Sequence, residues 1–102
     1  MSKAQETAQK LIQEHDVAIF SKSYCPYCRK AKIIIKGLEL DESRVGILEL
    51  DEMGQEGADI QDYLEKETGQ RTVPSVWIKQ KFIGGSSDLA AISEDKLLEM
   101  VN

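Results

Sequence analysis

Residues 17–37 read VAIFSKSYCPYCRKAKIIIKG and carry the clearest structural signal in the chain. Its first four residues are all apolar, as in a short buried strand. From Pro26 onward the apolar residues recur at helical spacing until Gly37, a residue type that commonly ends a helix. A strand that leads directly into a helix is the repeating unit of an α/β sheet. Cys25 and Cys28 stand at the junction between the two.

The same periodicity extends the pattern over the rest of the chain. We expect a helix over residues 2–15, a strand over 45–50, a helix over 57–67, two strands over 76–79 and 81–83 paired around Gln80, a segment over 86–92, and a last helix capped by Ser93. Strands separated by helices imply parallel pairing, and the last two strands form a hairpin on the sheet. The order αβαβαββα plus a C-terminal helix therefore predicts an α/β sandwich with helices on both faces.

Length and composition favour one ordinary globular domain over residues 1–102. The chain has a mass of 11.4 kDa and is 41% hydrophobic and 30% charged. Its net charge of −5 argues against nucleic-acid binding as its main role. No apolar run approaches the roughly 20 residues that span a bilayer, and residues 1–10 lack the apolar stretch of a signal peptide. We therefore expect a cytoplasmic protein, in a compartment where structural disulfides are rare.

Charge is spread unevenly along the chain. Residues 22–36 hold five bases and no acid, residues 37–67 hold eleven acids and two bases, and residues 68–81 hold three bases and no acid. One interpretation is that these charges only solvate two helical faces. The other is that both basic stretches meet around one anion-binding cleft.

The position of the cysteine pair indicates chemistry rather than a structural role. At a helix start the backbone N–H groups are unpaired and stabilise an anion, and proline is well tolerated at the first helical position. Cys25 is expected at the cap and exposed, with Cys28 one turn inside and covered. The helix terminus and Lys22 together are expected to lower the pKa of Cys25 and so favour its thiolate. Two inert cysteines would not need this position, and with His15 as the single histidine a zinc site lacks ligands.

The heptapeptide Lys22-Ser-Tyr-Cys25-Pro-Tyr-Cys28 resembles the active-site motif of dithiol glutaredoxins, in their fungal and eukaryotic class. Three further stretches resemble family motifs in the same order: a helix with a glutathione-contacting glutamine at 57–61, a cis-proline loop at 72–74, and a second glutathione-binding turn at 83–89. The resemblance covers nearly the whole chain and implies a thioredoxin-like three-layer sandwich around a four-stranded mixed sheet. Many members carry cysteine after the double glycine; Ser86 stands there, which excludes regulation through an extra thiol.

This resemblance implies a glutathione-dependent thiol–disulfide oxidoreductase. Cys25 alone would reduce glutathionylated mixed disulfides, and Cys25 with Cys28 would reduce protein disulfides. Glutathione would be a cosubstrate, with no tightly bound cofactor and no metal. The partners would be glutathione and glutathionylated or disulfide-containing proteins, and the protein would act as a monomer.

The resemblance also implies the residues that bind glutathione: Lys22, Tyr27, Gln61, Thr72, Val73, Pro74, Gly85, Ser86, Ser87 and Asp88. A cis Val73–Pro74 bond would turn the Val73 backbone toward the Cys25 sulfur. Lys22 and Gln61 would hold the glycine carboxylate, and the turn from Gly85 to Asp88 would hold the γ-glutamyl end. On their own, Lys22 could be a solvated lysine, Pro74 a strand-entry proline and Gly84-Gly85 a plain strand-ending turn. Ile19, Tyr63, Trp77, Ile78 and Phe82 are expected in the core.

Two other functions remain open at this point. A thioredoxin would use the same pair, but it would carry Gly-Pro between the cysteines and tryptophan before the first, and neither is present. An iron–sulfur carrier would hold a [2Fe–2S] cluster between two copies through Cys25 and glutathione, although Pro26 stiffens the loop. Visible absorbance after anaerobic purification distinguishes the carrier from the enzyme.

Overall fold

The computed structural model describes residues 2–102. Its helices and strands follow the predicted order, with two added 3-10 turns. In chain order they are α1 (Lys3–Glu14), β1 (Val17–Ser21), α2 (Pro26–Lys36), η1 (Glu42–Arg44), β2 (Val45–Glu49), η2 (Leu50–Glu52), α3 (Gln55–Thr68), β3 (Ser75–Ile78), β4 (Lys81–Gly84), α4 (Ser86–Ala90) and α5 (Glu94–Val101). Predicted ends differ by one to two residues in most elements, because caps and turns rather than hydrophobic spacing set them.

The four strands form one mixed sheet in the order β2-β1-β3-β4. β2 runs parallel to β1, as expected, but β3 runs antiparallel to β1, so the expectation of parallel pairing is wrong for this strand. β3 begins opposite the end of β1, with Ser75 paired to Phe20. α3 therefore does not carry the chain back to the end of the sheet where β1 begins. β3 starts at the end where β1 finishes, so it runs antiparallel to β1.

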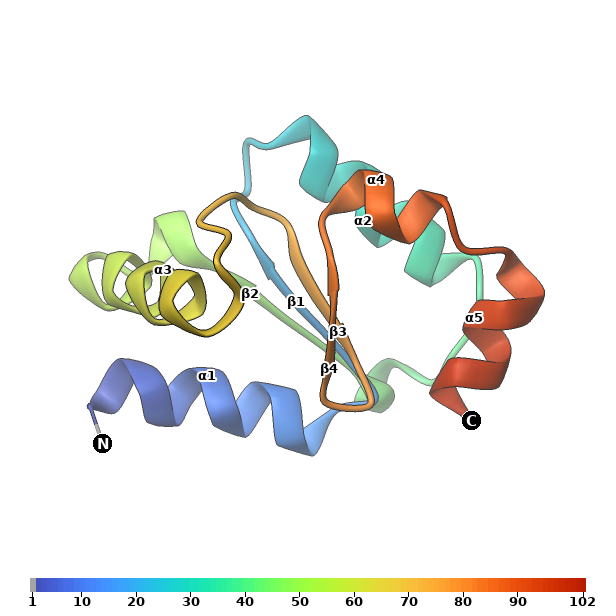
Figure 1. Ribbon diagram of the computed structural model, residues 1–102, viewed down its shortest axis with the longest axis horizontal. Helices are drawn as coiled ribbons and strands as arrows, with labels where there is room; N and C mark the ends of the chain where they lie inside the picture. Colours follow the sequence, from blue (N-terminus) through green and yellow to red (C-terminus); the bar gives the residue numbers. More distant parts are fainter. Residues whose placement is uncertain (1) are drawn as a thin grey trace.

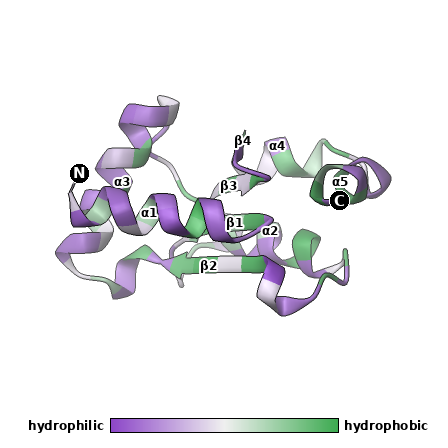
Figure 2. Cartoon of the chain, turned by 90° about the horizontal axis from the view of Figure 1, so that it is seen from below, coloured by the Kyte–Doolittle hydropathy of each residue, from purple (hydrophilic) through white to green (hydrophobic). Residues whose placement is uncertain are grey.

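Helices cover both faces of this sheet. Figure 1 shows α1 and α3 on one side of the strands and α2, α4 and α5 on the other. Side chains of β1 alternate between two cores: Val17 and Ile19 join the cluster under α2, α4 and α5, while Ala18 and Phe20 join the cluster under α1 and α3. The whole of β1 is buried, and β1 carries green hydrophobic colour in Figure 2. The three-layer sandwich is thus confirmed.

The predicted core residues divide into two groups. Ile19 and Ile78 are fully buried, as expected. Trp77, Phe82 and Tyr63 are only partly buried, so the prediction that they lie in the core is only partly correct. Trp77 and Phe82 pack ring against ring with centroids 5.3 Å apart, and β4 is the outer strand of the sheet with no neighbour beyond it. The Tyr63 hydroxyl accepts a hydrogen bond of 3.0 Å from Gln9 Nε2 of α1.

The hairpin between β3 and β4 turns at Lys79 and Gln80. Both residues have positive φ angles, 50° and 69°, as the tight two-residue turns of hairpins require. Lys79 thus belongs to the turn rather than to the strand predicted over 76–79. This turn lies at the end of the sheet opposite the cysteine pair, because Ile78 pairs with Val17 at the start of β1.

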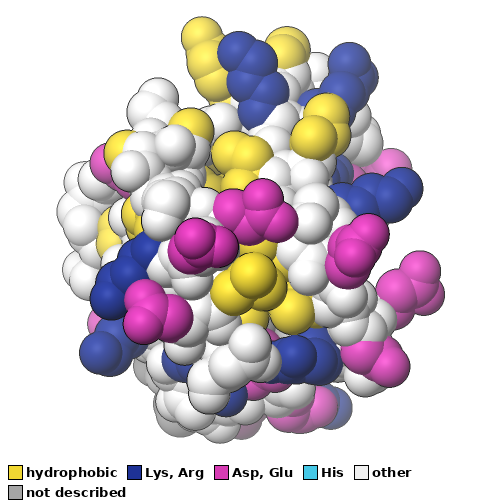
Figure 3. Space-filling view, turned by 90° about the vertical axis from the view of Figure 1, so that its right-hand side faces the viewer, with side chains coloured by type: hydrophobic (Ala, Val, Ile, Leu, Met, Phe, Trp, Pro, Cys, Tyr) yellow, Lys and Arg dark blue, Asp and Glu magenta, His cyan; other side chains and the backbone are white. Residues whose placement is uncertain are grey.

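The face formed by α2, α4 and α5 carries a line of apolar side chains, flanked by acidic and basic ones (Figure 3). A shallow hollow of about 310 Å³ lies between these helices and includes Ile33, Ile34 and Ile92. Within residues 2–102 no helix combines the length and the apolar character that crossing a membrane requires.

Candidate active site

The cysteine pair lies where β1 passes into α2. The loop of residues 22–24 follows β1, and the Cys25 N–H donates to the Lys22 carbonyl at 3.1 Å. Cys25 is the N-cap of α2 in extended conformation, and Pro26 occupies the first helical turn. The Cys25 sulfur accepts a hydrogen bond from the Cys28 N–H at 3.4 Å. The predicted cap geometry is therefore confirmed.

The two thiols differ in exposure and in acidity. Cys25 is partly exposed and Cys28 is fully buried, and both are free. Burial acts to raise the pKa of Cys25, but hydrogen bonds from the Cys28 thiol and from backbone N–H groups of Cys28 and Tyr27 outweigh it and hold that pKa below the ordinary value. Burial, followed by the hydrogen bond with Cys25, raises the pKa of Cys28. The exposed sulfur is thus the better nucleophile.

Lys32 is the positive side chain that most lowers the pKa of Cys25, a role that the sequence analysis gave to Lys22. Lys32 lies on α2, two turns beyond Cys25, and its ammonium pairs with Glu49 Oε2 of β2 at 2.6 Å. The Glu49 Oε1 atom is buried and has no hydrogen-bond partner within the described chain. Helical spacing could have identified Lys32, since residues 25, 28 and 32 share one helix face.

The loop before β3 approaches Cys25 from the other side. The Val73–Pro74 bond is cis, as predicted. The Cys25 thiol donates to the Val73 carbonyl at a distance of 3.9 Å. Val73 therefore lies beside the nucleophile, although it is 48 residues away in the sequence.

Most of the predicted glutathione-binding residues line one shallow pocket of about 180 Å³. Its lining comprises Tyr27, Gln70, Thr72, Val73, Pro74, Gly85, Ser86, Ser87 and Asp88. Gln70 was not predicted, because a polar residue in a loop carries no signal of its own. Lys22 and Gln61 are not part of this lining.

The turn after β4 depends on Gly84. Its φ angle is +124°, and a Cβ atom at this position would lie 2.3 Å from Asp88 Oδ2. That carboxylate oxygen accepts a hydrogen bond of 2.9 Å from the Gly85 N–H, so Asp88 caps the turn. A hydrogen bond within the protein thus holds this turn in place without a ligand.

Gln61 and the second basic stretch have protein partners of their own. Gln61 Nε2 donates to the Arg71 carbonyl at 2.7 Å, and the Arg71 guanidinium pairs with Asp62 and Glu65. Lys79 pairs with Asp16 at the far end of the sheet. The ion pairs of Arg71 and Lys79 therefore disfavour the interpretation that both basic stretches meet around one anion-binding cleft.

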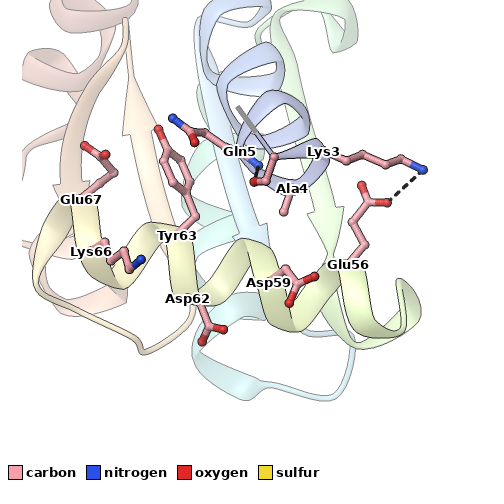
Figure 4. Close-up of a pocket in the computed structure, with 10 residues that line it drawn as sticks. Lys3, Ala4, Gln5, Glu56, Asp59, Asp62, Tyr63, Lys66 and Glu67 are labelled. Carbon is pink, nitrogen blue, oxygen red and sulfur yellow. Dashed lines mark hydrogen bonds and ion pairs between the residues drawn. The ribbon is translucent and has the colours of Figure 1, made fainter.

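A larger hollow of about 490 Å³ lies elsewhere, between the start of α1 and α3 (Figure 4). Acidic side chains of α3 border it, and Lys3 reaches across to Glu56 at 3.6 Å. Neither cysteine lines either hollow. The smaller hollow lies next to the reactive sulfur through Val73, a lining residue whose carbonyl oxygen is 3.9 Å from the Cys25 sulfur.

Comparisons with known proteins agree with this geometry. The glutaredoxin family model matches residues 17–83. The chain is 47% identical over 95 residues to glutaredoxin-1 of Rhizophagus irregularis. This alignment covers 93% of this chain and 90% of that protein. It is 43% identical over 100 residues to glutaredoxin-1 of Saccharomyces cerevisiae, with 94% and 90% covered.

Solved structures show the same likeness in three dimensions. The holo form of glutaredoxin C1 from Populus tremula x tremuloides superposes with a TM-score of 0.86 at 32% identity, covering 98% of this chain and 96% of that one. A buckwheat glutaredoxin–glutathione complex superposes with a TM-score of 0.85 at 38% identity, covering 96% and 86%. The matched region includes both cysteines and the cis-proline loop. The chain belongs to the glutaredoxin family, the glutathione-dependent thiol–disulfide oxidoreductases.

Proposed function

We propose that Cys25 is the nucleophile of a two-step exchange on glutathionylated substrates. Its thiolate attacks the glutathione sulfur of the mixed disulfide, and the substrate leaves as a thiolate that takes up a proton. Cys25 is then joined to glutathione. A second glutathione thiolate attacks the glutathione sulfur of this adduct, which yields oxidised glutathione and restores the Cys25 thiolate. The observation that carries the proposal is a partly exposed sulfur, hydrogen-bonded by N–H groups at a helix start.

Cys28 serves only the second route, the reduction of protein disulfides. Cys25 first attacks one sulfur of the substrate and releases the other as a thiolate. The Cys28 thiol then loses its proton as its sulfur attacks the Cys25 sulfur. The substrate leaves as a thiolate that takes up a proton, and a Cys25–Cys28 disulfide remains. Two glutathione molecules reduce that disulfide. The position of Cys28 next to Cys25 supports this role, because nearness replaces a second bimolecular encounter.

Glutathione lies in the pocket beside Cys25 in this proposal. Its backbone pairs with Val73 in the manner of an added strand. Its γ-glutamyl carboxylate meets the N–H groups of Ser86 and Ser87, and its ammonium meets Asp88, beside Gly85. The shared lining of these residues supports the placement, with Tyr27, Thr72 and Pro74 forming the rest of the wall. The buckwheat relative in complex with glutathione supports a site of this kind.

Lys22 and Gln61 hold the glycine carboxylate at the other end of the ligand. Gln61 gives one amide proton to the Arg71 carbonyl and keeps the other for the ligand. Lys22 acts as a point charge. The chain works as one domain over residues 1–102 and as a monomer in the cytoplasm. It has no tightly bound cofactor. Its substrates are glutathionylated and disulfide-containing proteins.

The test compares two variants on two substrates. Cys25→Ser should lose all turnover on both a glutathionylated peptide and a protein disulfide. Cys28→Ser should keep most of its activity on the glutathionylated peptide and lose most of its activity on the protein disulfide. Equal collapse of both activities in Cys28→Ser would contradict the resolving role of Cys28.

A coupled assay separates this proposal from a thioredoxin. Turnover should depend on glutathione with glutathione reductase, and thioredoxin reductase should not replace them. Turnover supported equally well by thioredoxin reductase alone would overturn the proposed cosubstrate.

A further inference from the structure

A single carboxylate outside the predicted site anchors the loop that precedes Cys25. Asp51 Oδ1 accepts a hydrogen bond of 2.9 Å from the Ser23 N–H, and Asp51 Oδ2 accepts one of 2.5 Å from the Ser23 hydroxyl. Asp51 belongs to η2, directly after β2. Because β1 and β2 are adjacent and parallel, their carboxyl ends meet at one edge of the sheet. Ser23 follows the first strand and Asp51 follows the second.

Asp51 also lies near a charge of the proposed ligand site, because its hydrogen-bond partner Ser23 directly follows Lys22 in the chain. The two hydrogen bonds from Ser23 hold the pKa of Asp51 below its ordinary value, and the nearby charge of Lys22 lowers it further. The carboxylate is therefore ionised at neutral pH. An ionised Asp51 competes with any other carboxylate that approaches Lys22.

We propose that Asp51 is a positioning residue of the active-site loop, with two separable effects on glutathione use. Its hydrogen bonds hold Ser23, and with it Lys22 and the start of α2, in the geometry that binds glutathione. Its negative charge weakens the attraction between Lys22 and the glycine carboxylate of glutathione. The second effect rests on the role proposed above for Lys22; the first does not.

Two substitutions at this position separate the two effects. Asp51→Asn removes the charge and retains both contacts, because the amide oxygen accepts from the Ser23 N–H and the amide N–H donates to the Ser23 hydroxyl. Asp51→Ala removes both contacts as well as the charge. The comparison of Asn with the wild-type protein measures the charge, and the comparison of Ala with Asn measures the hydrogen bonds.

The KM for glutathione should fall about twofold to fivefold in Asp51→Asn with an unchanged kcat, the range expected for an exposed charge pair. It should rise in Asp51→Ala relative to Asp51→Asn, with a lower kcat and faster amide exchange at Ser23. The effect of Asp51→Asn should vanish in a Lys22→Gln background. Ser23→Ala, which removes one contact only, should shift KM and kcat in the direction of Asp51→Ala and serves if Asp51→Ala does not fold.

Asp41 provides a matched control. Its Oδ1 atom accepts from both the N–H and the hydroxyl of Ser43, at 2.9 and 2.7 Å, so the donors are of the same kind as at Asp51. Asp41 lies just before β2 and thus at the other end of the sheet. Asp41→Asn and Asp41→Ala should leave KM and kcat unchanged. Wild-type kinetics in both Asp51 variants would overturn the proposal. A Lys22→Gln variant with unchanged KM would instead contradict the ligand role of Lys22 and leave the hydrogen-bond effect to stand on the Ala–Asn comparison.

Discussion

Lys32 links the acidity of Cys25 to a half-buried carboxylate of β2, Glu49. Its ammonium is shared between two tasks: it lowers the pKa of Cys25 and neutralises Glu49. A positive charge favours the thiolate most when no counter-ion stands beside it. Glu49 therefore restrains the effect of Lys32 on the sulfur.

Substitutions of this pair should move the pKa of Cys25 in opposite directions. Lys32→Gln should raise it, because a favourable charge is lost. Glu49→Gln should lower it, because Lys32 then acts without its counter-ion. The ultraviolet absorbance of the thiolate, followed through a pH titration, measures both shifts. Lys36→Gln, one turn further along α2, is the control and should change little; a shift there as large as that of Lys32→Gln would refute the assignment.

The lowered pKa of Cys25 also predicts the pH dependence of the reaction. The thiolate is the reactive form, so kcat/KM on a glutathionylated peptide should rise with pH through the pKa of Cys25 and then level off. Levelling should occur below about pH 8.5, where an ordinary thiol ionises. Cys28 stays protonated there because burial raises its pKa. A rate that continues to climb through the ordinary thiol range would disagree with a lowered pKa.

At the scale of elements, Gly57 decides how closely α3 approaches η2. A Cβ atom on Gly57 would lie 1.9 Å from the Leu50 carbonyl oxygen, so the helix could not stay where it is. Gln61 lies one turn further along the same helix. The packing of α3 against η2 thus sets the position of Gln61, a residue of the proposed ligand site.

Gly57→Ala should destabilise the protein by about 1–3 kcal/mol, as overpacking commonly does, and should raise the KM for glutathione through the displacement of Gln61. Urea unfolding and steady-state kinetics measure the two effects. Glu67→Ala introduces the same side chain on an exposed position of α3 and should leave both nearly unchanged. Equal stability of the two variants would contradict the close packing described here.

Elements with strong local signals could be predicted from the sequence, and elements set by tertiary contacts could not. The helix that starts at Pro26 and the hairpin around Gln80 carry local turn and cap signals, and they were found. The direction of β3 depends on which end of the sheet the chain has reached when α3 ends. Hydrophobic spacing does not encode that position. Its reversal is what brings Val73 beside Cys25.

The same distinction holds in the site. The motif around Cys25 identified the nucleophile and most of the pocket lining, because those residues lie in contiguous stretches. Lys32 and Asp51 lie outside those stretches and were missed. Lys32 acts on Cys25 along one face of α2, and Asp51 acts through Ser23 on another element. Asp51 could have been found from topology, because it follows a strand that ends beside the active-site loop.

At the scale of the whole molecule, a charged cluster closes the end of the sheet opposite the cysteines. Asp16 pairs with Arg44 at 2.6 Å and with Lys79 at 3.1 Å. Arg44 also donates to the Val101 carbonyl at the end of α5, at 2.6 Å. Four segments distant in sequence are thus joined through Asp16 and Arg44.

Asp16→Asn should lower the free energy of unfolding at neutral pH by roughly 1 kcal/mol, a value suited to a partly exposed pair. Hydrogen bonds from Arg44 and then Lys79 lower the pKa of Asp16, so its stabilisation is present above the unfolded-state value near 3.8 and is lost as the pH falls through the lower folded value. The variant should therefore lose less stability on acidification than the wild-type protein. Denaturation between neutral and acidic pH measures this; Glu14→Gln, an exposed acid nearby, is the control and should follow the wild-type curve.

The complete burial of Cys28 has a consequence for labelling experiments. A thiol-alkylating reagent applied to the reduced, folded protein meets one accessible sulfur, so the first adduct forms on Cys25 and intact-mass analysis gives a single addition. A second addition requires the start of α2 to open. The rate of the second addition therefore reports the opening equilibrium of that helix turn, and a small maleimide can be used to measure motion at the active site.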